Sequence, residues 1–406
     1  ERAVDRFAVR RVAKMGGAQV AAALVLASAS NMIAVVKSAP LDGPEGTAIR
    51  ECPVPTPGPG EVLIRVAATG ICGTDKHIYH WDPSIRGKVQ PPRTYGHEFC
   101  GFVEELGENA ARDHEGKLAV GDYVSAEMHI ICGECYQCRA GDGHICIRTK
   151  IYGLDQDGAF AEFVKVPAGN VIKLPSFIPP RVGAFLDALG NAVHTTQVVD
   201  LAGKSVAITG FGPIGAMSAA IAEHNGASVV IVTDVSDHAL ETARRWAASR
   251  NFDNLHTFNV RTTEPAVVKQ AVEALTGGVG VDVVCEMSGS SAGINFGLEI
   301  VGMGGTLSLL GLPAGHSVTI DDYTRNVIFK GVTMHGIIGR RMYSTWQRML
   351  GMLRAGLDVA WVVQATYDSL RDFHEGIARF DRHEALKVVF FPEGESAAET
   401  RLKRQS

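Results

Sequence analysis

The chain has 406 residues, of which 46% are hydrophobic and 20% are charged, and its formal net charge is −5. A chain of this length exceeds what one hydrophobic core supports and predicts two domains. The weakly acidic balance argues against nucleic acid or an acidic membrane surface as a partner. The sequence contains no run of about eighteen uninterrupted apolar residues, which a membrane-spanning helix would need.

The first 31 residues have the outline of an export signal. Arg10, Arg11 and Lys14 precede an apolar run that ends in small residues, a pattern typical of targeting segments. The alternative is a disordered extension, because Met32 directly precedes the first strand-like run. Cysteines spaced for metal suit a reducing compartment. We therefore expect a cytoplasmic protein in which residues 1–31 lie outside the folded domains.

The remaining residues predict an α/β protein with two domains. Residues 32–187 are short half-buried strands between Gly, Pro and Asp turns, which predicts a β-rich catalytic domain. Residues 188–332 alternate strands with helices, which predicts a doubly wound (Rossmann) parallel sheet. Residues 333–392, which end in the strand-like "ALKVVFFP", are expected to return to the first domain. The charged residues 393–406 are expected to form a flexible tail.

Four of the eight cysteines lie within fifteen positions, in "CGECYQCRAGDGHIC". The spacing C-x2-C-x2-C-x7-C places Cys132, Cys135, Cys138 and Cys146 on a polar loop. A ferredoxin-type iron–sulfur site needs three residues rather than seven before its last cysteine, and disulfides need an oxidising compartment. The pattern therefore favours one structural Zn²⁺ held by four thiolates, which leaves no open position for chemistry.

Catalysis must then lie elsewhere, and Cys72 with His97 and Glu98 is the candidate. Cys72 follows a strand, in "GICGTDKHIYHWD", and "GHEF" comes 25 residues later. Cysteine, histidine and a carboxylate are ligands of catalytic zinc, which keeps one position open for substrate. Alone the pattern is weak, because buried cysteines usually pack as small apolar residues. A neighbouring cofactor motif strengthens it.

That motif is "GFGPIG", residues 210–215, which follows a strand and opens a helix. Gly210 allows the tight turn, Gly212 lets the backbone approach a pyrophosphate, and Gly215 lets the helix pack on the strand. Asp234 lies nineteen residues after Gly215, at the end of "VVIVTD". Its carboxylate would bind the ribose hydroxyls and repel a 2′-phosphate, so NAD is favoured over NADP.

Together these motifs resemble those of the zinc-dependent medium-chain alcohol dehydrogenases. The resemblance covers residues 32–391 and is carried by "CGTDKHIYHWD", "GHEF", "GNAVHT", "GFGPIG" and "EMSG", which are most like those of the threonine dehydrogenases. It implies a GroES-like catalytic domain and a catalytic zinc on Cys72, His97 and Glu98. It also implies a proton relay of Thr74 and His77, with Asp187 assisting the metal site from behind its ligands. The implied NAD contacts are Ile214, Asp234, Leu310, Gly311, Leu312, Ile337 and Ile338.

Two departures from the family pattern accompany the resemblance. Ala239 stands where the family often has a basic residue that contacts the adenosine. The stretch "DALGNAVH" also replaces a proline–phenylalanine pair that the family tends to have before the glycine.

The resemblance implies oxidation of L-threonine to 2-amino-3-oxobutanoate by a homotetramer with two zinc ions per chain. Zinc would stabilise the alkoxide, which transfers hydride to NAD⁺. A polyol or 2,3-butanediol dehydrogenase would share these motifs. A zinc-ribbon module that binds nucleic acid is disfavoured, because residues 127–150 hold three basic and three acidic side chains. A catalytically inactive binding protein is disfavoured because the expected ligands are all present.

Overall fold

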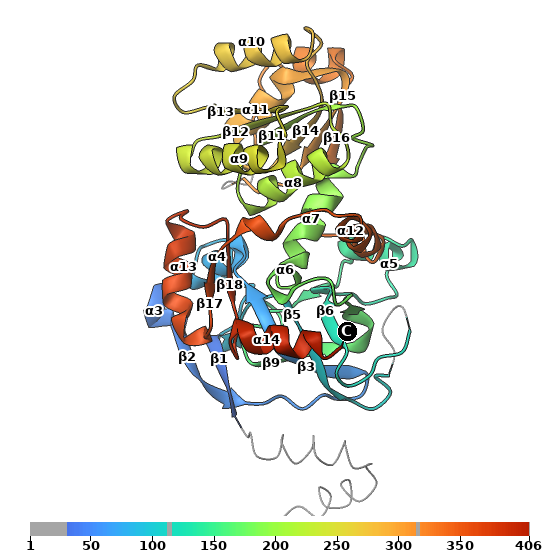
Figure 1. The fold of residues 1–406 in the computed structure, drawn as a ribbon, viewed down its shortest axis with the longest axis vertical. Helices are drawn as coiled ribbons and strands as arrows, with labels where there is room; N and C mark the ends of the chain where they lie inside the picture. Colours follow the sequence, from blue (N-terminus) through green and yellow to red (C-terminus); the bar gives the residue numbers. More distant parts are fainter. Residues whose placement is uncertain (1–30, 112–115, 314–316, 406) are drawn as a thin grey trace, which may run out of the picture.

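The structure, a computed structural model, describes residues 31–111, 116–313 and 317–405. These residues form two lobes, and helix α7 (Leu186–Thr196) runs from one to the other (Figure 1). The prediction for residues 1–31 lies outside the described residues except for Asn31, which begins strand β1 (Asn31–Lys37). Among the described helices, none combines the length and apolar character that crossing a bilayer requires.

A six-stranded parallel sheet forms the upper lobe, in the order β13-β12-β11-β14-β15-β16. The order reverses between β11 and β14, and ligands of such sheets bind at the carboxyl ends of the strands at this point. The central strand β11 is buried at all five positions, as its apolar sequence requires. The elements are β11 (Ser205–Thr209), α8 (Pro213–His224), β12 (Val229–Asp234), α9 (Asp237–Arg250), β13 (Leu255–Asn259), α10 (Pro265–Leu275), β14 (Val281–Glu286), α11 (Ser291–Ile300), β15 (Val301–Leu309) and β16 (Thr333–Gly336).

Strand β16 corrects the predicted end of this domain at residue 332. Residues Thr333–Gly336 pair in parallel with Thr306–Leu309 of β15, so the parallel sheet continues past that boundary. The strand lies at the sheet edge and its side chains are exposed or half-buried. It therefore lacks the apolar run from which the other strands are predicted.

A seven-stranded sheet forms the lower lobe, in the order β10-β6-β5-β3-β18-β17 with β9 also paired to β3. Strand β18 pairs antiparallel with β3, Val389 with Gly70 and Phe390 with Thr69. The chain thus returns to this lobe after the parallel sheet. The elements are α3 (Gly43–Gly46), β2 (Thr47–Pro53), β3 (Glu61–Gly70), α4 (Gly73–Tyr79), β4 (Arg93–Thr94), β5 (Glu98–Leu106), β6 (Tyr123–Ala126), β7 (His129–Ile130), α5 (Tyr136–Arg139), β8 (Lys150–Ile151), β9 (Phe163–Pro167), β10 (Val171–Lys173), α6 (Pro180–Gly183), α12 (Ser344–Arg354), β17 (Val363–Tyr367), α13 (Phe373–Asp381) and β18 (Lys387–Phe390).

The final residues do not form the flexible tail that their charge predicts. They form helix α14 (Glu395–Lys403), which lies across the lower lobe (Figure 1). Ala398 and Leu402, one helical turn apart, are buried, and Glu395 accepts a hydrogen bond of 2.6 Å from Arg181. Two apolar residues on one face and an anchoring ion pair suffice to dock a helix whose sequence has little apolar periodicity.

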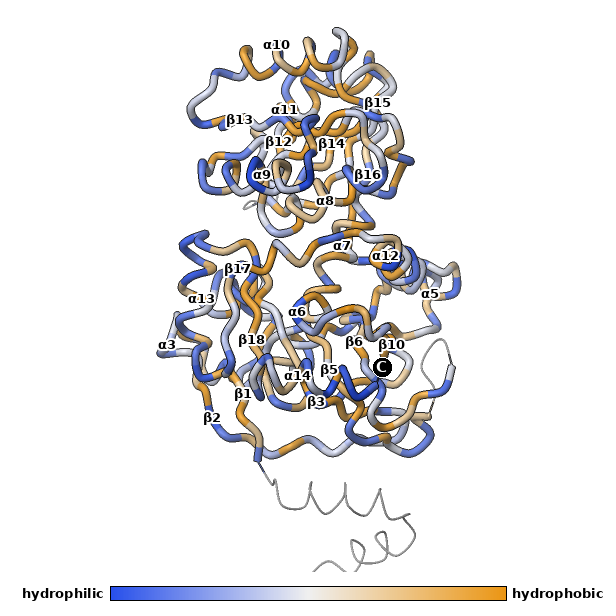
Figure 2. The backbone as a smooth tube through the Cα atoms, in the orientation of Figure 1, coloured by the Kyte–Doolittle hydropathy of each residue, from blue (hydrophilic) through white to orange (hydrophobic). Residues whose placement is uncertain are grey.

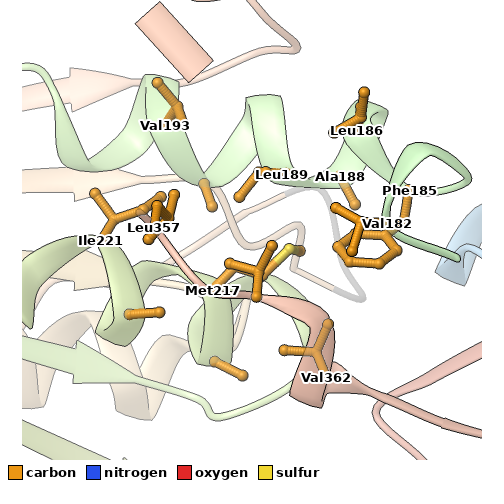
Figure 3. Packing of buried hydrophobic residues seen from close by; sticks show 14 of the residues in the cluster. Val182, Phe185, Leu186, Ala188, Leu189, Val193, Met217, Ile221, Leu357 and Val362 are labelled. Carbon is orange, nitrogen blue, oxygen red and sulfur yellow. The ribbon is translucent and has the colours of Figure 1, made fainter. Parts of the chain in front are cut away.

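The two lobes share one hydrophobic core at their junction. Figure 3 shows Leu189 of α7 pointing toward Met217 of α8. Val193 and Ile221 of the same two helices are buried as well, and all four residues are at most 1% exposed. Burying one such side chain contributes about 1.5–3 kcal/mol. Figure 2 shows apolar segments running through the interior of both lobes and polar ones on outer helices such as α9. The packing fixes the start of α7, which carries Asp187.

A surface cluster joins α4 to distant segments of the lower lobe. His80 follows α4, and its Nδ1 lies 2.9 Å from Asp42 while its Nε2 lies 2.6 Å from Asp381. Lys76 also lies 3.2 Å from Asp381. Burial alone would lower the pKa of His80, but the two carboxylates outweigh it and raise that pKa. Protonated His80 thus ties α4 to α3 and α13.

We predict that this tie is pH-dependent. Because the folded-state pKa of His80 is raised above its unfolded value of about 6.5, its stabilisation is fully present below that value. It is lost as the pH rises through the folded pKa. His80→Gln should lower the melting temperature more at about pH 5.5 than at about pH 9. Lys76→Gln is the matched control, because it removes another cation that contacts Asp381, and its loss should be the same at both pH values. Equal losses for His80→Gln at both pH values would contradict the assignment.

Candidate active site and metal centres

The structure brings the four loop cysteines together in one cluster. Their sulfur atoms lie 3.4 Å apart for Cys135–Cys138, 3.5 Å for Cys132–Cys146, and 3.9 Å for both Cys132–Cys138 and Cys135–Cys146. Four thiolates around one Zn²⁺ at about 2.3 Å lie about 3.8 Å from each other. Disulfide sulfurs would lie about 2.05 Å apart. The geometry therefore fits a closed tetrahedral site and excludes disulfide pairing.

Hydrogen-bond donors surround the sulfur atoms. The backbone N–H groups of Cys132 and Arg148 donate to Cys146, and the Arg148 guanidinium donates to Cys132, each at 3.4 Å. Backbone donors, first that of Glu134, together with Arg148 lower the pKa of Cys132 to about 6. The loop thus favours the thiolate form that metal binding requires.

Cys72, His97 and Glu98 form a second cluster, with ligand atoms within 4.8 Å of one another. Cys72 lies just after β3, between it and α4, and Glu98 begins β5. Because β3 and β5 pair antiparallel, with Gly70 opposite Glu98, the end of one strand meets the start of the other. This pairing explains how residues 25 positions apart in the sequence become neighbours.

Buried negative charge dominates this second cluster. His97 Nδ1 and Glu98 Oε1 are buried without a hydrogen-bond partner. Burial alone would lower the pKa of His97, but the facing Asp75 and Cys72 raise it to about 10. Burial raises the pKa of Glu98 to about 6 even beside Lys387. Such a site attracts a cation, and its sulfur, nitrogen and oxygen donors fit Zn²⁺.

Asp75 and Lys387 belong to this site although the sequence motifs did not indicate them. Asp75 Oδ2 accepts the Cys72 N–H at 2.9 Å, and its Oδ1 lies 3.7 Å from His97 Nδ1. Asp75 thus lies next to the histidine ring, where carboxylates orient histidines that bind a metal. Lys387 Nζ lies 2.5 Å from Glu98 Oε2 and donates to the Ile71 carbonyl at 2.8 Å. A lysine inside the apolar run "ALKVVFFP" was the available signal, since a buried lysine needs an acidic partner.

Asp187 lies at the start of α7, 5% exposed, where its charge acts on both His97 and Glu98. Its Oδ1 lies 2.8 Å from the buried guanidinium of Arg340. Asp187 was predicted to assist the metal site, whereas nothing in the sequence pointed to Arg340.

Thr74 and His77 lie on α4, three positions apart and so on one side of this short helix. Thr74 Oγ1 lies 4.0 Å from Cys72 Sγ, at the metal cluster. His77 is half exposed, and its Nδ1 lies 3.3 Å from Asp82. Thr74 thus lies at the cluster and His77 at the surface, which are the two ends that a relay would need.

The glycine motif forms the turn between β11 and α8. Gly210 adopts φ +95°, which favours glycine, and a Cβ on Gly215 would lie 2.1 Å from the Gly210 carbonyl oxygen. Gly212 has open space around it instead, where a pyrophosphate can approach. Asp234, at the end of β12, accepts the Phe211 N–H at 2.6 Å and so holds the turn.

The other predicted cofactor contacts line the same edge of the sheet. The N–H groups of Leu310 and Gly311 donate to the Glu286 carbonyl at 3.0 and 3.1 Å, and the Ile337 N–H donates to Leu309 at 2.9 Å. Leu312 is 86% exposed and Ile338 51% exposed. Ile214, in the first turn of α8, is half-buried beside the glycine motif. Exposed apolar side chains at the carboxyl edge of this sheet are what a bound dinucleotide would cover.

The chain matches two family models, the alcohol dehydrogenase GroES-like domain over residues 58–176 and the zinc-binding dehydrogenase over residues 213–355. It is 43% identical over 350 residues to an L-threonine 3-dehydrogenase of Caldanaerobacter subterraneus subsp. tengcongensis, covering 86% of this chain and 96% of that one. It is 41% identical to an L-threonine 3-dehydrogenase of Bacillus subtilis, again with 86% and 96% coverage. A crystal structure of an alcohol dehydrogenase from Thermotoga maritima superposes with a TM-score of 0.80 at 25% identity, covering 89% of this chain and all of that one.

The chain therefore belongs to the zinc-dependent alcohol dehydrogenase family. Its two lobes are the GroES-like domain and the Rossmann-type dehydrogenase domain of that family. The predicted fold class is confirmed.

Removal of one loop cysteine should cost the chain one metal ion. Cys135→Ser should lower the zinc content by about one per chain and the apparent melting temperature by at least about 5 °C. Zinc is measured by mass spectrometry and melting by calorimetry. Cys52→Ser is the control, since Cys52 lies outside both clusters. Unchanged zinc content in Cys135→Ser would contradict the structural site.

Two glycine variants should separate packing from cofactor binding. Gly215→Ala should destabilise the fold by about 1–3 kcal/mol, because its Cβ meets the Gly210 carbonyl. Gly212→Ala should leave the melting temperature unchanged, because Gly212 has φ −74° and open space. It should nevertheless raise the Kd for NADH by about tenfold, since a methyl group would obstruct the pyrophosphate. Fluorescence titration gives the Kd, and wild-type affinity in Gly212→Ala would refute the placement.

Proposed function

We propose that this chain is an L-threonine 3-dehydrogenase, which oxidises L-threonine to 2-amino-3-oxobutanoate and reduces NAD⁺ to NADH. The observation that carries the proposal is the cluster of Cys72, His97 and Glu98 in one lobe, with a dinucleotide turn in the other. The identity to L-threonine 3-dehydrogenases over most of the chain supports threonine as the substrate.

The residues of the cluster have distinct roles in the proposed reaction. Zinc held by Cys72, His97 and Glu98 would supply Lewis-acid stabilisation of the substrate alkoxide. Thr74 and His77 would carry the hydroxyl proton to solvent, and NAD⁺ held at the glycine turn would accept the hydride from the hydroxyl-bearing carbon. Each turnover thus yields one ketone, one NADH and one proton.

The cofactor is proposed to be NAD rather than NADP. The Asp234 carboxylate stands at the end of β12, where the adenosine ribose of such cofactors binds. A 2′-phosphate there would meet like charge. Val235, Ser236 and Asp237 follow it and supply no cation.

We further propose two zinc ions per chain, one for each of the two ligand clusters. We also propose a cytoplasmic enzyme, because eight unpaired cysteines suit a reducing compartment.

A homotetramer is supported by exposed apolar side chains at two places. Met303, Ile328 and Phe329 lie near the open sheet edge at β16, and Tyr136 and Ile147 lie on the cysteine loop. Exposed apolar patches of this kind mark protein contacts. Sedimentation equilibrium of the full chain tests the four-chain mass.

The alternative is a polyol or 2,3-butanediol dehydrogenase, which would use the same zinc and NAD machinery. The metal ligands and the glycine turn act on the alcohol and the cofactor, so they do not distinguish these substrates. A substrate panel does.

The proposal predicts NAD-dependent turnover of L-threonine, followed as NADH absorbance at 340 nm. A zinc chelator should abolish turnover and added Zn²⁺ should restore it. Cys72→Ser should lower kcat/KM by about 10³-fold or more, because it removes a metal ligand, whereas Cys52→Ser should not. Turnover of sorbitol or 2,3-butanediol but not of threonine would support the mechanism and reject threonine as the substrate. No turnover of any alcohol at full zinc content would contradict the proposal.

A further inference from the structure

Arg340 is completely buried at the junction of the two lobes. It lies between β16 and α12, two residues after Ile338, which lines the cofactor edge of the parallel sheet. A buried guanidinium is costly unless its charge is neutralised and its donors are satisfied. The partners of Arg340 therefore indicate what its position serves.

The guanidinium contacts two carboxylates from different parts of the fold. It donates to Glu127 from two of its three nitrogens, Nε at 2.9 Å and Nη2 at 2.6 Å. Nη2 also lies 2.8 Å from Asp187 Oδ1, and Nη1 donates to the Asp187 carbonyl at 3.0 Å. Arg340 thus binds both the side chain and the backbone of Asp187, beside the metal cluster.

Glu127 is itself held rigidly, so it can anchor the guanidinium. Its Oε2 accepts a hydrogen bond from Trp346 Nε1 at 2.8 Å, and its Oε1 lies 2.7 Å from His129 Nδ1. Arg340 keeps the pKa of Glu127 below its usual range despite full burial. The carboxylate is therefore charged and fixed.

The backbone around Arg340 is shaped to let it through. A Cβ on Gly190 would lie 2.2 Å from Arg340 Cδ, so α7 has room for the arginine stem only because residue 190 is glycine. Gly339 adopts φ +54°, and a Cβ there would lie 2.8 Å from the His129 ring. Residues 339 and 340 thus lie between α7 and the β6–β7 region.

We propose that Arg340 is a positioning residue that fixes Asp187 behind the metal ligands and residues 337–338 at the cofactor edge. One guanidinium then sets the geometry of the metal site and the affinity for NADH together. This inference rests on the proposed metal and cofactor sites. A purely structural ion cluster would instead affect stability without changing either site in the folded protein.

The test compares Arg340→Lys with wild type in the full chain loaded with Co²⁺ in place of Zn²⁺. Lysine keeps the charge but cannot bind Glu127 and Asp187 together in a planar fork. We expect a shifted visible absorption band of the Co²⁺ bound at Cys72 and a Kd for NADH raised by about tenfold or more. Arg341→Met is the matched control: Arg341 is the adjacent residue, is exposed and pairs with Asp142 at 3.3 Å. It should change neither readout.

A second variant and a wild-type measurement keep the test decisive if Arg340→Lys folds poorly. The double variant Glu127→Gln/Arg340→Met removes both charges of the anchoring pair and should show the same two changes. In the wild-type chain, NADH should slow hydrogen exchange in the peptides holding residues 127–131 and 187–191 as well as 337–343.

A folded Arg340 variant with an unchanged Co²⁺ absorption band and an unchanged Kd for NADH would overturn the inference. Slowed hydrogen exchange confined to residues 337–343 when NADH binds to wild type would overturn it as well. Failure of the proposed function looks different, because wild type itself would then show no Co²⁺ band from Cys72 or no NADH binding.

Discussion

Buried negative charge at the lobe junction is the constraint on which the rest of the structure depends. Asp75, Glu98, Glu127 and Asp187 are each at most 5% exposed, and they face the buried cations Lys387 and Arg340. Uncompensated charges in such an environment cost several kcal/mol each. The excess around Cys72 and His97 is what a divalent cation neutralises. This charge balance supports the proposed metal site.

The same residues explain why the two lobes act together. Helix α7 carries Asp187 in its first turn and packs its apolar side on α8, whose first turn follows the glycine motif (Figure 3). Arg340 reaches the same carboxylate from the segment that follows β16. The proposed metal ligands come from the lower lobe and the proposed dinucleotide edge from the upper one. Their relative position is thus set by a continuous core and one buried guanidinium.

The sequence predicted those features that depend on residue types at short, fixed separations. The cysteine loop and the glycine turn were predictable because their chemistry requires fixed residue types at short separations, and the alternation of strands and helices gave the parallel sheet. Asp187, Leu310–Leu312 and Ile337–Ile338 came only from family resemblance. Lys387 and Arg340 were missed because their partners lie far away in sequence. Strand β16 and helix α14 were missed because neither has an apolar period: β16 pairs with β15 through its backbone at the sheet edge, and α14 docks through Ala398 and Leu402. Even where a local signal exists, as for the lysine in the apolar run "ALKVVFFP", it does not identify a partner hundreds of residues away.

The most direct test of the account is the location of metal in crystals of the full chain, by anomalous diffraction on both sides of the zinc absorption edge. The account predicts two zinc peaks per chain. One lies among the sulfurs of Cys132, Cys135, Cys138 and Cys146, and the other lies within about 2.3 Å of Cys72 Sγ and bonded to His97. A chain with full cysteine-loop occupancy and no peak at Cys72 and His97, under conditions where it turns over alcohol, would contradict it.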